Sequence, residues 1–90
     1  MANETQQGEP IYFYEFDAPS NEHLRFDGVV RVVLDNHRNG TQHLRITDPD
    51  APSGFRNINS VKNEEQWDSK YDRNTSGEDY WERADEGWTP

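Results

Sequence analysis

Paired carboxylates are the most frequent groups in this sequence that could take part in chemistry. Adjacent acids stand at residues 64–65, 78–79 and 85–86, a possible basis for general acid–base catalysis. Such catalysis needs one acid in an apolar pocket that raises its pKa. These pairs lie instead in the most polar third of a 90-residue chain, which leaves little room for a cleft. We therefore expect solvated acids and no enzymatic activity.

Metal-binding patterns are weak. His23, His37 and His43 show neither a His-x-x-His nor a His-Glu-x-x-His spacing. The loop from Asp48 to Gly54 begins like a calcium loop but lacks the glycine at its sixth position and the glutamate at its twelfth. The chain contains no cysteine, which excludes disulfides and cysteine-based metal sites. We therefore expect no metal and no cofactor.

The acidic, aromatic segment at residues 63–90 is the leading candidate for a binding surface. It holds nine acidic and three basic residues, and aromatic anchors set among charges suit a protein interface. We expect it to meet a basic surface of a partner, such as a nucleic-acid-binding protein. The candidate contact residues are Glu64, Glu65, Trp67, Asp68, Tyr71, Glu78, Asp79, Tyr80, Trp81, Asp85, Glu86 and Trp88. The alternative interpretation is that the rings simply close the small core.

Outward-pointing arginines form a second candidate surface. Strand alternation places Arg25 and Arg31 on the solvent side, and His43 and Arg45 on the solvent side of the next strand. A basic sheet face flanked by aromatics is one way in which small β domains hold single-stranded nucleic acid. The net charge of -9 opposes this. Scattered surface arginines are the simpler interpretation, and we do not expect direct nucleic-acid binding.

Hydrophobic alternation predicts the strands that must position these side chains. A first strand is expected at residues 11–16, a second at 24–34, a third around 43–46 and a fourth at 55–61. Gly28 interrupts the inward-facing series and predicts a bulge or a sharp bend. The side chains expected in the core are Phe26, Val30, Val32, Leu34, Leu44 and Ile46.

Capping signals predict two short helices beyond this sheet. Asn63 followed by two glutamates is a helix start, and Trp67 and Tyr71 then share a face. Trp81, Ala84 and Trp88 would share the face of a second helix. Helices this short form only when their rings dock on the sheet or on a partner.

The expected fold is therefore mainly β, with α+β as the alternative. It consists of a small antiparallel sheet or meander of three to four strands, with one or two short helices in the acidic C-terminal third. Residues 1–9 are expected to be a flexible arm, residues 10–62 the β-rich core, and residues 63–90 the acidic aromatic segment, helical or partly disordered. Whether the sheet curls into a closed form, and the oligomeric state, remain open.

Composition limits the function. Hydrophobic residues make up 30% of the chain and the mean hydropathy is -1.26, and no apolar run could span a membrane. Without a leader pattern, we expect a cytoplasmic protein. The expected function is non-enzymatic protein binding, in one version by an inhibitor that mimics nucleic acid. Alternatives are a nucleic-acid-binding module and a structural subunit of a larger assembly, such as a viral one. Halophilic adaptation is another explanation of the acidity.

Overall fold

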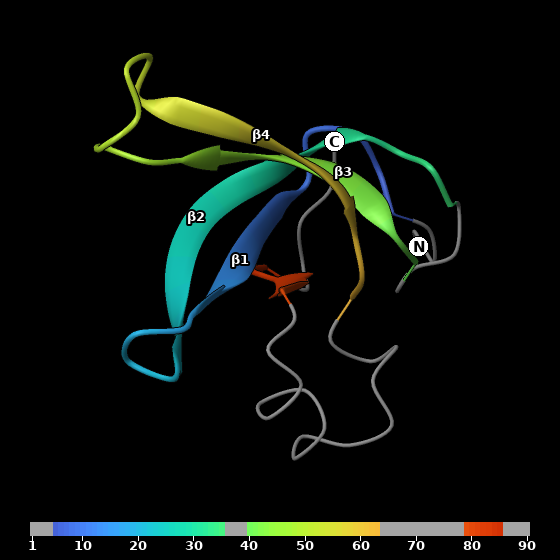
Figure 1. Ribbon diagram of the computed structural model, residues 1–90. Coiled ribbons are helices and arrows are strands. Elements are labelled where there is room, and N and C mark those ends of the chain that lie inside the picture. The colour runs from blue at the N-terminus through green and yellow to red at the C-terminus, as the bar shows by residue number, and fades with distance from the viewer. Residues whose placement is uncertain (1–4, 36–39, 64–78, 86–90) are drawn as a thin grey trace.

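The computed structural model describes residues 5–35, 40–63 and 79–85, which form one antiparallel sheet without a helix (Figure 1). Its strands are β1 (Pro10–Asp17), β2 (Glu22–Val32), β3 (Gln42–Thr47), β4 (Phe55–Val61) and β5 (Tyr80–Arg83). Their order in the sheet is β4-β3-β2-β1-β5. The first four strands make a meander, and β5 returns to the free side of β1. The prediction of a mainly β fold is confirmed.

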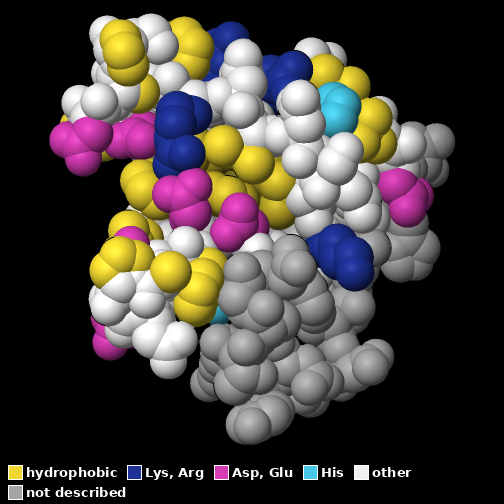
Figure 2. Space-filling model, in the orientation of Figure 1, with side chains coloured by type: hydrophobic (Ala, Val, Ile, Leu, Met, Phe, Trp, Pro, Cys, Tyr) yellow, Lys and Arg dark blue, Asp and Glu magenta, His cyan; other side chains and the backbone are white. Residues whose placement is uncertain are grey.

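The sheet is strongly curled, so that strands distant in its order face each other. Arg56 of β4 donates from Nη1 and Nη2 to the carboxylate of Glu15 on β1 at 3.0 and 3.1 Å, and from Nε to Asp48 at 2.7 Å. Two strands separate β1 from β4, so this contact can only form across the concave side. Figure 2 shows hydrophobic side chains gathered in a hollow between charged groups, in the orientation of Figure 1.

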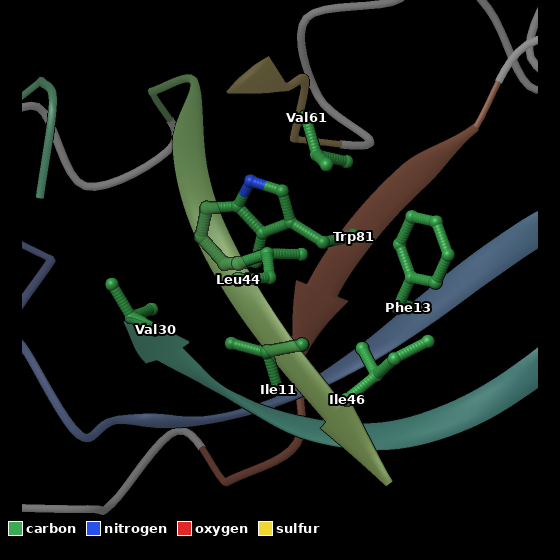
Figure 3. Packing of buried hydrophobic residues seen from close by; sticks show 7 residues of the cluster. All are labelled: Ile11, Phe13, Val30, Leu44, Ile46, Val61 and Trp81. Atoms are coloured by element: carbon green, nitrogen blue, oxygen red, sulfur yellow. The ribbon is translucent and has the colours of Figure 1, made fainter. Parts of the chain in front are cut away.

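The hydrophobic core lies on the concave inner face of this curl. Its fully buried members are Ile11, Phe13, Val30, Leu44, Ile46, Val61 and Trp81, which come from all five strands (Figure 3). Phe26, Val33 and Ile58 are partly buried and pack against this cluster. The prediction of Val30, Leu44 and Ile46 as core residues is thus confirmed, while Phe26 lies at the border of the core.

The prediction that Val32 and Leu34 are core residues is wrong, because β2 carries a bulge. The pairing of β2 with β3 shifts between Val30 and Val32. One extra residue reverses the alternation of side chains beyond it, so that Val33 turns inward while Val32 is 40% and Leu34 50% exposed.

Of the two features predicted for Gly28, a bulge or a sharp bend, the bulge is absent, because Gly28 lies in regular pairing opposite Ile46. A Cβ atom at this position would lie 2.5 Å from the carbonyl oxygen of Arg45. Glycine is therefore explained by the close approach of the neighbouring strand.

Residues 80–83 form a strand where the sequence pattern suggested a helix. Trp81 stands opposite Phe13 and Arg83 opposite Ile11, so these side chains point inward. The backbone N–H of Trp81 also donates to the carbonyl oxygen of Lys62 at 3.0 Å, and Asn63 forms a parallel bridge with Trp81. Backbone pairing on both sides of residues 80–83 therefore outweighs the helical spacing of their side chains. The remainder of the expected helices falls on residues 64–78 and 86–90, which lie outside the described residues.

Residues 5–9, which were expected to belong to a flexible arm, are held against β2 and β5. The N–H of Gly8 donates to Val30 O at 2.8 Å, and the N–H of Val30 donates to Glu9 O at 3.0 Å. Glu9 also forms a buried ion pair with Arg83, and the Nη2 group of Arg83 donates to Thr5 Oγ1 at 3.1 Å. A polar segment is thus ordered by one buried ion pair and by backbone pairing.

Candidate binding surface on the outer face of the sheet

The arginines on the inner face are paired with carboxylates. Arg56 bridges Glu15 and Asp48, and Arg83 contacts Glu9. Hydrogen bonding to Glu15 is the main reason why the pKa of Arg56 is raised, although partial burial opposes it. These two arginines therefore stabilise the curl of the sheet and the packing of its ends.

Two arginines on the outer face, Arg25 and Arg45, lie on aromatic rings instead. The Cζ atom of Arg25 is 4.6 Å from the centre of the Tyr12 ring, and that of Arg45 is 4.5 Å from the centre of the Phe55 ring. Both side chains are exposed, and neither forms an ion pair with a carboxylate of the described residues. The chain has 18 acidic and only 9 basic residues, so unpaired arginines stand out against its composition.

Arg31 reaches from β2 across β3 to β4. Its Nε donates to the carbonyl oxygen of Leu44 at 3.5 Å, and its Nη2 donates to Oδ1 of Asn59. Arg31 lies where the β2–β3 register shifts, and bulges commonly redirect a side chain in this way. No carboxylate of the described residues pairs with its guanidinium.

These arginines border exposed apolar side chains. Val29 stands opposite Arg45, and Val32 opposite His43, so the pairs share the outer face. We call the arginine patch the surface formed by Val29, Arg31, Val32, His43, Arg45 and Phe55. A shallow hollow of about 270 Å³ at its side is lined by Gln7, Gly8, Val29, Val30, Arg31 and Arg45. The acid of β2 closest in sequence to the patch is Asp27, two residues before Val29.

The other end of the outer face is a closed aromatic cluster. The rings of Tyr14 and Tyr80 are stacked with their centres 4.7 Å apart, and the His23 ring lies 5.0 Å from Tyr80 and 5.5 Å from Phe16. The Tyr14 hydroxyl donates to Glu82. Burial, followed by this hydrogen bond, raises the pKa of Tyr14 well above its ordinary value. The cluster therefore fixes β5 to β1.

Strong alkali is expected to weaken the fold through Tyr14. Because its pKa is raised in the folded state, neutral Tyr14 stabilises the protein, and this contribution is lost as the pH rises above about 10, where the unfolded chain ionises. In Tyr14→Phe, stability should fall less between about pH 9 and pH 11 than in the wild type. Denaturant unfolding at several pH values measures this difference. Equal pH slopes for the two proteins would contradict the assignment.

The structure separates the residues of the first predicted surface. Trp81 is fully buried and Tyr80 is buried, so both belong to the core or to the aromatic cluster, as the alternative interpretation of the rings required. Oδ1 of Asp79 accepts the backbone N–H of Phe16 at 2.9 Å, whereas Asp85 is exposed. The remaining candidates, which are Glu64, Glu65, Trp67, Asp68, Tyr71, Glu78, Glu86 and Trp88, lie outside the described residues.

The second predicted surface is brought together only in part. Arg31, His43 and Arg45 lie within the arginine patch, while Arg25 lies further along β2, opposite Tyr14. The ring of His43 accepts the backbone N–H of Ser60 at 3.0 Å through Nδ1. Sequence reasoning missed Phe55 beneath Arg45, although the alternation of Phe55, Asn57 and Asn59 with Arg56 and Ile58 indicated that it faces away from Ile58.

Within residues 5–35, 40–63 and 79–85, no group of three acidic or histidine side chains is arranged to hold a metal ion. The same part of the chain has no helix with the length and apolar character needed to cross a membrane. Searches against protein-family models, curated proteins and solved structures each found no match.

Proposed function

We propose that this chain is a non-enzymatic protein-binding module and that the arginine patch is its contact surface. The observation that carries the proposal is the pair Arg45 and Phe55. In this very acidic chain, an exposed guanidinium without a carboxylate partner lies on an exposed aromatic ring. Arginine and aromatic residues are enriched in the parts of interfaces that contribute most to affinity.

The surroundings of this pair support the same function. Val29 and Val32 are exposed beside Arg45 and His43 and supply apolar area. The hollow beside Arg31 and Arg45 is open and shallow, which suits one side chain of a partner better than a substrate enclosed for reaction. Unpaired guanidiniums favour a partner with carboxylates, because opposite charges in contact fix the position of the partner and exclude wrong partners.

The acidic segment does not contribute to this proposal. Of its candidate anchors, Tyr80 and Trp81 are buried and therefore not accessible to a partner. The nucleic-acid-binding alternative uses the same arginines. However, the net charge of -9 repels a polyanion at long range, whereas a short acidic peptide carries far less charge.

Selection from a displayed peptide library tests the proposal. The full chain and its Arg45→Glu variant are each used as bait, with Arg25→Glu as a matched control, because Arg25 also lies exposed on a ring. Peptides selected by the wild type should bind the Arg25→Glu variant nearly as well and lose binding to Arg45→Glu by about tenfold or more, the cost of one charge-assisted contact. Thermal melting confirms that each variant folds.

Two outcomes would overturn the proposal. Peptides that bind all three proteins equally would show that the patch is not the contact surface. Tight binding of a labelled single-stranded oligonucleotide at physiological salt, lost in Arg45→Glu, would establish the nucleic-acid-binding alternative instead.

A further inference from the structure

We infer that the partner binds as an extended strand along the free edge of β4, and that it carries two acidic residues four positions apart. This inference rests on the proposed function and specifies its partner. In the described part of the chain, β4 is the last strand on its side of the sheet. Only the residues just after it meet β5, through the bridge between Asn63 and Trp81. No strand of the described residues therefore pairs with the outer edge of the stretch from Phe55 to Asn59.

The backbone of this edge is oriented for pairing. The N–H of Asp48 donates to the carbonyl oxygen of Gly54 at 2.9 Å, which fixes the phase of the β3–β4 ladder. In an antiparallel ladder, hydrogen-bonded pairs alternate with pairs whose N–H and C=O groups point away from the partner. Ile46–Arg56 is then a hydrogen-bonded pair, whereas Phe55 and Asn57 direct their backbone groups to the free edge.

Between Phe55 and Ile58 the edge carries little of the usual protection against strand addition, because the register shift of the β3–β4 pairing lies beyond Ile58. Natural edge strands are commonly blocked by proline, by lysine or by an inward-pointing charge. The segment Phe55–Ser60 contains neither proline nor lysine. Its one charged side chain, Arg56, points to the inner face, where Glu15 and Asp48 neutralise it.

Two guanidinium groups, from strands further inside the sheet, extend towards this edge. Arg45 of β3 extends over the ring of Phe55, and Arg31 of β2 contacts the side chain of Asn59. Both groups therefore lie over β4 on the outer face, about one strand spacing (4.8 Å) from the position of an added strand. Neither is paired with a carboxylate of the described residues.

The spacing of these contacts defines the pattern of the partner. Residues 55 and 59 are four apart, which corresponds to about 13 Å along a regular strand. The pairing of β4 with β3 is regular from Phe55 to Ile58, and its register shifts between Ile58 and Val61. The residues of an added strand that lie opposite them are also four apart, whether the strand runs parallel or antiparallel. Carboxylates at those two positions would meet Arg45 and Arg31, while the backbone pairs with Phe55 and Asn57.

A designed peptide of nine residues tests this pairing. In it Thr and Val alternate, and Glu replaces two of the Thr residues that stand four positions apart. Titration into the ¹⁵N-labelled full chain should shift the amide signals of Phe55 and Asn57 and slow their hydrogen exchange. The same peptide with Gln in place of both Glu should bind about tenfold or more weakly, because two charge-assisted contacts are lost.

Protein variants separate the edge from the face. Arg31→Glu and Arg45→Glu should each weaken binding about tenfold, while Arg25→Glu should change it less than about twofold. Asn57→Pro removes an N–H that the sheet does not use, so it should abolish peptide binding without lowering the melting temperature greatly. If this variant fails to fold, the inference is tested by whether the peptide slows hydrogen exchange at the amides of Phe55 and Asn57 in the wild type.

Several results would overturn this inference. Equal binding of the Glu and Gln peptides would show that the two arginines do not contact carboxylates of the partner. Equal losses of peptide binding in Arg25→Glu and Arg45→Glu would show that only the net charge of the protein affects binding. Unshifted amide signals at Phe55 and Asn57 would exclude strand addition. A dimer seen by sedimentation and lost in Asn57→Pro would make a second copy the occupant. If library peptides still depend on Arg45 in any of these cases, the proposed protein-binding function stands while the strand-addition inference fails.

Discussion

Replacing Trp81 with alanine is expected to remove most of the protein's stability and to lower its melting temperature strongly. The indole is completely buried, packs among core residues of the other four strands, and donates from Nε1 to the carbonyl oxygen of Gly40 at 3.2 Å. Truncating a buried tryptophan costs about 3–5 kcal/mol. A domain of this size has a total stability near the lower end of about 5–15 kcal/mol. Circular dichroism during heating measures the loss.

Trp81→Phe is the matched control for this prediction. It keeps a ring in the core but removes the hydrogen bond to Gly40, so its melting temperature should fall between those of the wild type and Trp81→Ala. If Trp81→Ala instead melts like the wild type, β5 does not complete the core, and the described packing of the C-terminal strand is incorrect.

Val30→Asp is expected to abolish folding, whereas Val32→Asp should be tolerated. Val30 is buried, so an aspartate at this position would place a carboxylate among Ile11, Leu44 and Trp81. This would lower the free energy of unfolding by more than about 3 kcal/mol. Simple alternation assigns Val32 to the same face and predicts unfolding for it too. The bulge turns Val32 to the solvent side, where aspartate remains hydrated.

The two aspartate variants share one readout, the unfolding transition in denaturant. The difference between them tests the register of β2 directly, since the substitutions are chemically identical and two residues apart. If both variants unfold, Val30 and Val32 lie on the same inner face and β2 has no bulge between them. Tolerance of both would mean that the end of β2 does not contribute to the core.

The strands were predictable where hydrophobic alternation is unbroken. Leu44 and Ile46 alternate with His43 and Arg45, and the structure places the first pair inside and the second outside. The bulge near Arg31 was not predictable, since an extra residue in a strand of valines leaves the composition unchanged. Its consequence is the exposure of Val32, which alternation alone assigns to the core.

Other features depend on contacts between distant parts of the chain. The four residues of β5 are too few to show a period, and their pairing with β1 is set by the packing of Trp81 rather than by local preference. Gln42 is fully buried although it is polar. Its Oε1 accepts the N–H groups of Leu34 and Asp35, and its Nε2 donates to Asp35 O at 2.6 Å. No pattern in the sequence indicates such a clamp.

The candidate surface was predictable in its residues but not in its geometry. Alternation correctly directs Arg25 and Arg45 to the solvent. The ring under each guanidinium, and the reach of Arg31 to Asn59, follow from strand order and register. The absence of carboxylate partners for these arginines among the described residues also became visible only once Arg56 and Arg83 were seen to be paired.

The position of β5 has a consequence for how this protein folds during synthesis. The meander of β1 to β4 is complete once Val61 has been made, but the indole that fills its concave side is contributed by residue 81. At about 5–20 residues per second, a ribosome needs roughly one to four seconds to make the chain between these points. Throughout that interval Ile11 and Phe13 lack their final cover. Folding therefore finishes only after β5 has left the ribosome and Trp81 can pack on the inner face of the sheet.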